Sequence, residues 1–188
     1  MVVNAILFFV EAAAGFLAHS TALLADSLDM FGDAMVYGFS LYVLWRSAEW
    51  KAMAAILKGA IMTVFGVGVL IEALHKMTTG VLPVAETMGV IGFVVLLGNS
   101  LCFLLLFRHR SDDLNMRSTW LCSRNDIIAN LSVLVAAAGV GVFQSSWPDI
   151  VIGAVIAALF LRSAFTVLSE SVTELQKLKS NSKVTAWM

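Results

Sequence analysis

Three aspartates stand near the start of the chain in a run of otherwise apolar residues. Asp26, Asp29 and Asp33 are separated by steps of three and four residues, so on an α-helix they share one face. Further along, Cys122 and Asp126 lie four residues apart in a second apolar segment and share a face in the same way. Carboxylates and thiolates are ligands of divalent metal ions, so both groups predict metal chemistry.

Asp29, Asp33, Cys122 and Asp126 together would supply three carboxylates and one sulfur. Four donors of this kind suit tetrahedral zinc or a similar ion such as cadmium, whereas magnesium and calcium prefer oxygen alone. With a rise of 1.5 Å per residue, both pairs lie roughly 9–16 Å from the ends of their helices. We therefore predict that the two pairs meet near the middle of a membrane and bind one metal ion.

Two polar residues lie close to the predicted ligands along the same helix faces. Asp26 is nearer the outer end of its helix, and Asn130 continues the face of Cys122 and Asp126 by one turn. We expect Asp26 and Asn130 to support the site or to line the path to it. Cys102 has no acidic neighbour, and we expect it to pack against other helices.

Two further acids fall inside apolar segments and need partners. They are Glu11 and Glu72. An ion pair between Arg124 and one of these acids is the simplest interpretation, because an isolated charge inside a membrane is costly.

The composition excludes an ordinary water-soluble domain. Hydrophobic residues make up 60% of the 188 residues and charged residues 13%, against about 45–50% and about 25% in globular proteins. The formal net charge of -1 excludes the basic surface of a nucleic-acid-binding protein. The cysteines and the first residues argue against two further features. The two cysteines lie in apolar stretches, so we expect no disulfide framework. The first residues carry no positive charge, so we expect no secretory signal.

Six segments approach the roughly 20 apolar residues that a helix needs to cross a bilayer. They are residues 2–18, 22–45, 52–75, 87–107, 116–143 and 148–168. We therefore predict an all-α polytopic membrane protein with six transmembrane helices in residues 1–168. Residues 169–188 are predicted to form a short polar tail in the cytoplasm.

The positions of lysine and arginine predict the orientation of these helices, because cytoplasmic loops are enriched in both. With six spans, only Lys76 falls on one side of the membrane. The other side holds Arg46, Lys51, Arg108, Arg110, Arg117, Lys177, Lys179 and Lys183. Both termini are therefore predicted to be cytoplasmic, in a multi-pass protein of the cell (inner) membrane.

The apolar segments with acidic residues carry a family resemblance. The run HSTALLADSLDMFGD, from His19 to Asp33, resembles the helix-two signature of the cation diffusion facilitator family, which ends in His or Asp, three residues and Asp. The run NMRSTWLCSRND, from Asn115 to Asp126, is similar to the helix-five signature, where His-x-x-x-Asp is usual. Residues 147–149, Trp-Pro-Asp, are similar to the Asp-Pro of helix six with the order reversed.

The resemblance implies a dimeric exporter of divalent metal, usually zinc, that runs on proton antiport. It implies that Asp29, Asp33, Cys122 and Asp126 form the transport site, with Asp29 and Cys122 at the places of the usual histidines. The loop after the second helix has no histidine, so no second metal site is expected there. The tail from Ser169 is too short for the cytoplasmic domain typical of the family, so dimerisation is expected to rest on the membrane helices.

Proton exchange also follows from electrostatics. Three carboxylates in one poorly hydrated site cannot all remain ionised without a metal ion. Metal binding requires deprotonated ligands, so it should expel protons. Alternating access to the site is implied by the resemblance.

We thus predict a secondary transporter without enzymatic activity and without a permanent cofactor. Its predicted substrates are Zn²⁺ or Cd²⁺ and protons, and its partners are the lipid bilayer and a second copy of the chain, with no nucleic acid. One alternative is an exporter of Co²⁺, Mn²⁺ or Fe²⁺ that uses the same site. A membrane-embedded metalloenzyme is disfavoured, because four protein ligands close the coordination shell that catalytic zinc keeps open. A metal-binding accessory subunit is a further alternative.

The predicted thiolate ligand, Cys122, should influence which metal ions are transported. Cysteine favours zinc and cadmium over manganese, so Cys122→Ser should reduce cadmium transport more than manganese transport, and Cys122→His should restore zinc transport. Radiometric uptake into proteoliposomes measures both. An equal loss for every metal would show that Cys122 packs rather than binds.

Overall fold

The computed structural model describes the backbone of residues 2–43, 46–107 and 114–185. Within these ranges, the side chains of residues 36, 37, 40–43, 106, 114–123, 179 and 181–185 lie outside the description. The predicted loop residues Arg108 and Arg110 and the side chains of Arg117, Lys179 and Lys183 therefore lie outside the described part.

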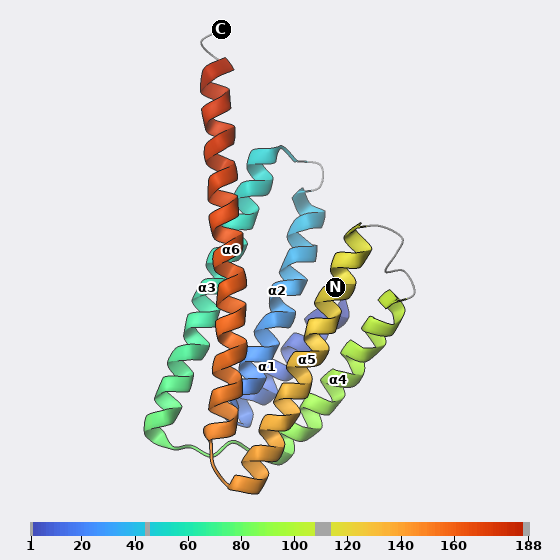
Figure 1. Cartoon of the computed structure of the whole chain (residues 1–188), viewed down its shortest axis with the longest axis vertical. Coiled ribbons are helices and arrows are strands. Elements are labelled where there is room, and N and C mark those ends of the chain that lie inside the picture. The colour runs from blue at the N-terminus through green and yellow to red at the C-terminus, as the bar shows by residue number, and fades with distance from the viewer. Residues whose placement is uncertain (1, 44–45, 108–113, 186–188) are drawn as a thin grey trace.

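The described residues form six α-helices and no strand, which confirms the predicted all-α class (Figure 1). The helices are α1 (Val2–Leu17), α2 (Thr21–Val43), α3 (Ala48–Thr79), α4 (Ala85–Phe107), α5 (Leu114–Phe143) and α6 (Trp147–Thr185). Each corresponds to one of the apolar segments. Hydrophobic length and short polar connections are therefore enough to locate the helices.

The last helix is longer than its apolar part. It continues from the predicted end of the span at residue 168 to Thr185, and it extends beyond the other helices in Figure 1. Residues 169–185 contain neither glycine nor proline. Glu174 and Lys177 are three residues apart on this part of the helix, a spacing that supports a helix in water.

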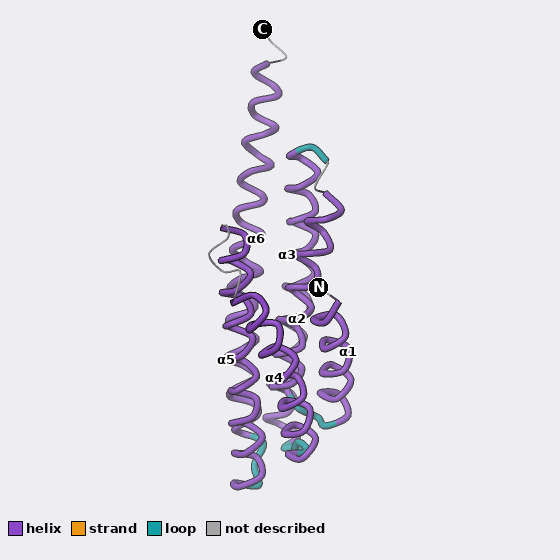
Figure 2. The backbone as a smooth tube through the Cα atoms, turned by 90° about the vertical axis from the view of Figure 1, so that its right-hand side faces the viewer, coloured by secondary structure: helices purple, strands orange, loops and turns teal. Residues whose placement is uncertain are grey.

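Among the residues that the structure describes, four helices have the length and apolarity to cross a membrane: α3, the part of α4 over Ala85–Leu105, the part of α5 over Arg124–Phe143, and the part of α6 over Trp147–Leu178. Helix α1 is apolar but has 16 residues. Helix α2 has 23 residues, and its three aspartates lower its hydrophobicity. All six helices run side by side with their axes close to parallel (Figure 2).

Helix α2 occupies the centre of the bundle. It contacts α1, α3, α5 and α6, while α3 packs along α6 and α4 along α5. Small residues allow the α3–α6 contact to be close: a Cβ on Gly59 would lie 2.6 Å from Leu168, and one on Gly66 would lie 2.7 Å from Leu161. Small residues at such positions let helices approach closely in lipid.

The start of α2 is held by a carboxylate from α6. Asp149 accepts hydrogen bonds from the backbone N–H of Thr21 (2.8 Å) and of Ala22 (3.1 Å) and from the Ser20 hydroxyl (2.6 Å). The Ser20 hydroxyl oxygen in turn accepts the N–H of Leu23 at 3.1 Å. The first N–H groups of a helix have no partner within the helix and favour a negative charge. Asp149 therefore caps α2 from a distant part of the chain.

A lysine completes this arrangement, which we call the helix-end cluster (Ser20, Lys76 and Asp149). Lys76, near the end of α3, forms an ion pair with Asp149 at 2.6 Å and donates a hydrogen bond to the His19 carbonyl. The Lys76 side chain is 2% exposed and that of Asp149 is 0% exposed. His19 has a φ of 52°, which turns the chain between α1 and α2. The buried carboxylate of Asp149 and the ammonium group of Lys76 thus together join the ends of α1, α2, α3 and α6.

The helix-end cluster should contribute strongly to stability as a pair. Asp149→Ala leaves a buried lysine without its counter-charge, so we expect the free energy of unfolding to fall by about 3–5 kcal/mol. The double variant Lys76→Met/Asp149→Ala should lose less than the sum of the two single changes, because the first change already removes the ion pair. Unfolding of the purified protein in detergent measures each value. Additive losses would contradict a coupled pair.

Candidate metal centre

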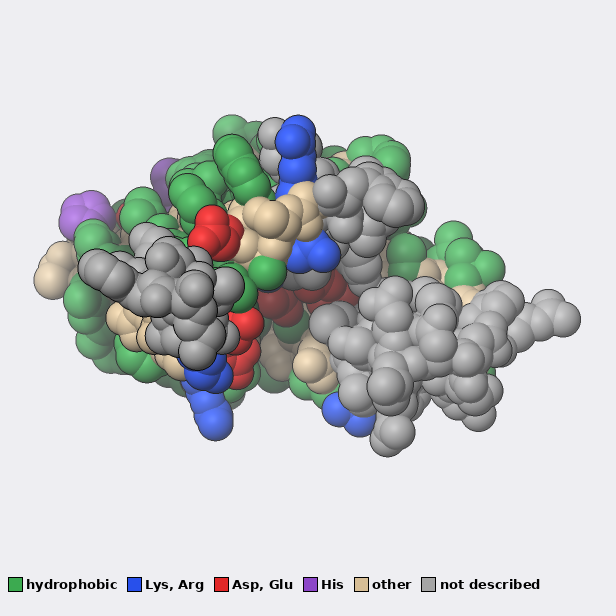
Figure 3. All heavy atoms as spheres, turned by 90° about the horizontal axis from the view of Figure 1, so that it is seen from above, with side chains coloured by type: hydrophobic (Ala, Val, Ile, Leu, Met, Phe, Trp, Pro, Cys, Tyr) green, Lys and Arg blue, Asp and Glu red, His purple; other side chains and the backbone are tan. Residues whose placement is uncertain are grey.

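The three aspartates of α2 lie inside the bundle because α2 is surrounded by four helices. Asp26 is buried, and Asp29 and Asp33 are partly buried. Seen from above, acidic side chains are visible between the helices (Figure 3). The shared face predicted from the spacing is therefore turned towards the protein interior.

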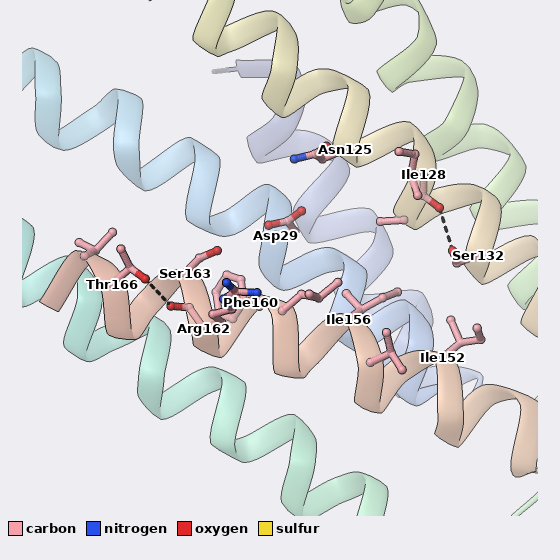
Figure 4. Close-up of a pocket in the computed structure, with 14 residues that line it drawn as sticks. Asp29, Asn125, Ile128, Ser132, Ile152, Ile156, Phe160, Arg162, Ser163 and Thr166 are labelled. Carbon is pink, nitrogen blue, oxygen red and sulfur yellow. Dashed lines mark hydrogen bonds between the residues drawn. The ribbon is translucent and has the colours of Figure 1, made fainter. Parts of the chain in front are cut away.

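A groove of about 790 Å³ leads to Asp29. It runs between α5 and α6, and Asp29 is the α2 residue that lines it (Figure 4). Its polar lining residues besides Asp29 are Asn125, Ser132, Arg162, Ser163 and Thr166. The Asp29 carboxylate projects from α2 into the space between the two helices (Figure 4). A cation could thus reach a carboxylate inside the bundle without disturbing its helices.

Asp126 of α5 is buried and lies within electrostatic reach of the α2 aspartates. The strongest of these interactions is with Asp33, followed by Asp29 and Asp26. Lys58 of α3 also interacts electrostatically with Asp33. The structure therefore brings the acidic faces of α2 and α5 towards each other, as their positions in the sequence predict.

The complete set of four ligands remains a prediction. Among the side chains that the structure describes, no three His, Cys, Asp or Glu residues are grouped closely enough to hold one metal ion. The backbone of Cys122 belongs to α5, but its side chain lies outside the described part of the chain. Cys102 of α4 is free and half-buried.

Asp26 and Asn130, the two predicted supporting residues, contact each other. The Asn130 amide donates a hydrogen bond to Asp26 at 2.5 Å, and the Asn99 amide of α4 donates to the Asn130 oxygen at 3.1 Å. All three side chains are buried. Asn99 was not among the predicted site residues, although an amide in an otherwise apolar helix is a signal of a buried hydrogen bond.

Glu11 lies in a different environment from the one expected from the sequence. Its two carboxylate oxygens are buried and have no hydrogen-bond partner among the described residues, so it forms no ion pair with Arg124. Arg124 and Glu72 are both exposed. Of the two acids expected as a possible partner of Arg124, Glu11 is therefore excluded, because α1 turns Glu11 towards α2 and its Asp26.

Comparison with known proteins places these features in a family. Residues 1–176 match the family model described as the cation efflux transmembrane domain. The chain is similar to the "Cadmium, cobalt and zinc/H(+)-K(+) antiporter" of Bacillus subtilis (strain 168), with 28% identity over 185 residues, covering 87% of this chain and 57% of the relative.

Two zinc transporters are similar to the same degree. "Zinc transporter ZitB" of Escherichia coli (strain K12) is 29% identical over 189 residues, covering 92% of this chain and 59% of the relative. "Zinc transporter ZitB" of Yersinia pestis is 26% identical over 180 residues, covering 88% and 57%. The chain thus spans a little more than half the length of these relatives.

The groove can be tested by the accessibility of its wall. Ser163 lines the groove and is exposed, whereas the next residue, Ala164, is 0% exposed. A water-soluble maleimide should therefore label Ser163→Cys well above the parent chain, and the matched control Ala164→Cys should remain at the parent level. Gel-shift detection measures both. Equal labelling of the two variants would contradict a groove open to water.

Proposed function

The chain belongs to the cation efflux family, also called the cation diffusion facilitator family, and on that premise we propose that it exports divalent metal cations across a membrane. The observation that carries this proposal is the buried acidic face of α2. Asp29 of this face lines an open groove, and Asp33 lies within electrostatic reach of Asp126 on α5. Carboxylates inside a membrane are costly and mark ion pathways.

Zn²⁺ is the proposed principal substrate, and Cd²⁺ the second. Asp29, Asp33, Cys122 and Asp126 are proposed as its ligands. The names of the relatives support this choice, since they include zinc, cadmium and cobalt. A thiolate ligand favours the softer ions zinc and cadmium over manganese. Export of Co²⁺, Mn²⁺ or Fe²⁺ through the same ligands is the alternative.

Transport is proposed to occur by exchange with protons through alternating access. The relative from Bacillus subtilis is named a cadmium, cobalt and zinc/H(+)-K(+) antiporter. In this chain, the groove runs along α6 from Ile152 to Val167, while the helix-end cluster joins α1, α2, α3 and α6 at the ends of these helices near Asp149. Asp29 is proposed to be reached through the groove from the side of the α6 extension, because the cluster closes the other end of the bundle. Release on the other side requires the ends joined by the cluster to separate.

The remaining predictions complete the proposal. Residues 1–168 are proposed to form six spans with both termini in the cytoplasm, and residues 169–188 a cytoplasmic extension. The protein is proposed to be a homodimer, formed through its membrane helices, in the inner membrane. In this proposal the metal ion is a substrate rather than a resident cofactor. The protein is proposed to be a transporter without enzymatic activity.

Flux through the purified chain tests the proposed function. Asp33→Ala and Asp126→Ala should each reduce zinc uptake into sealed proteoliposomes to the level of empty liposomes, because each removes a charged ligand. Wild-type uptake should rise when a pH step is imposed that moves protons against the metal. Glu72→Ala, which removes an exposed acid of α3, is the matched control and should keep wild-type flux.

Three outcomes would count against the proposal. Wild-type flux in either aspartate variant would remove the proposed site. Metal binding without flux would favour the accessory subunit. If the pH step did not change the flux, a passive facilitator would explain the result better than a proton antiporter.

A further inference from the structure

A second acidic group lies beside the proposed metal ligands and is not one of them. It consists of Glu11 of α1 and Asp26 of α2, whose side chains are 0% and 1% exposed. The two carboxyl groups lie close enough to interact with each other. Both Glu11 oxygens lack a donor among the described residues, so the contact joins two acceptors unless a proton lies between them.

The hydrogen bonds around Asp26 have a direction. Asn99 donates to Asn130, and Asn130 donates to the Oδ2 atom of Asp26. Asp26 is thus the acceptor at the end of a chain of amides, as expected of an ionised carboxylate. Glu11 is then the group that can supply the missing donor. An O–H of Glu11 would donate to Asp26 and satisfy both side chains.

Electrostatics requires the same proton. Two ionised carboxylates in contact, both out of water, would combine a desolvation cost with direct repulsion. One proton removes one of the charges and creates a hydrogen bond to the other, of the strong charge-assisted kind. We propose that Glu11 and Asp26 share one proton and form a proton-binding site separate from the metal ligands. Its role in antiport rests on the proposed function.

The pair is placed so that a bound metal ion would act on it. Asp126 of α5 interacts electrostatically with Glu11, and Asp29 interacts with Asp26. Helix α4 presents the uncharged Asn99. Lys58 of α3 acts on Asp33, and Arg162 of α6 lines the groove beside Asp29.

These neighbours make metal and proton compete without a shared ligand. When the metal site is empty, it holds no positive charge that would oppose protonation of the pair. A divalent cation at that site brings positive charge close to Glu11 and Asp26, so the O–H bond of Glu11 breaks and its proton passes to solvent. The protons released by metal binding then come from two places: the metal ligands themselves, and the Glu11–Asp26 pair.

Glu11→Gln tests the pair because the glutamine amide can still donate to Asp26 but cannot lose a proton. Metal-free wild-type protein at neutral pH should show an infrared C=O band of a protonated buried carboxyl group, and Glu11→Gln should lose that component. The variant should still bind zinc, but it should release fewer protons per zinc in weak buffer, by up to about one. Glu72→Gln, the same change at an exposed position of helix α3, should behave as wild type.

Asp26→Asn is the second variant, since asparagine can accept from Asn130 and donate to Glu11. It should show the same reduced proton release, and thermal melting identifies which variants are folded. An unchanged carboxyl band together with unchanged proton release, in either folded variant, would overturn the shared proton. If the wild-type protein carried no zinc flux, the proposed function would fail, while the infrared band would still decide the protonation of the pair.

Discussion

The cost of placing carboxylates inside an apolar bundle is the constraint on which the rest of this structure depends. A charge at the centre of a membrane costs about 2.5–3.5 kcal/mol by insertion scales. This chain nevertheless places Glu11, Asp26, Asp29, Asp33 and Asp126 within its apolar helices. Four of these groups are compensated in different ways. Asp26 accepts a hydrogen bond from Asn130, Glu11 lies beside Asp26, Asp29 lines a groove, and Lys58 lies near Asp33.

The differences arise because one helix at the centre of the bundle carries three of the acids. Steps of three and four residues place side chains on roughly the same face of a helix, but at different angles around its axis. Asp26 therefore meets α1 and α5, whereas Asp29 reaches the space between α5 and α6. The helix-end cluster anchors the first turn of α2, and in this way sets the depth of both residues.

The helix-end cluster also has energetics suited to a gate. A buried ion pair gains little net stability over its hydrated state, because removing both charges from water offsets much of their attraction. If water entered the cluster and hydrated both groups, separating Lys76 from Asp149 would therefore cost less free energy than their direct contact suggests. Removal of one partner alone is far more costly, since the other is left buried and uncompensated. The same contact can thus hold α2 in register and still open in the proposed transport cycle.

The six helices, their approximate ends and the acidic faces of α2 and α5 could be predicted from the amino-acid sequence, because hydrophobic length and helical spacing are local properties. The extension of α6 to Thr185 could not, since the apolar pattern ends at residue 168 and only helix propensity continues. Which polar groups meet depends on the packing of the helices. Lys76 and Asp149 are 73 residues apart, and the pairing of Glu11 with Asp26 depends on how α1 is rotated against α2. Spacing along one helix shows which side chains share a face, but not which neighbouring helix that face will contact.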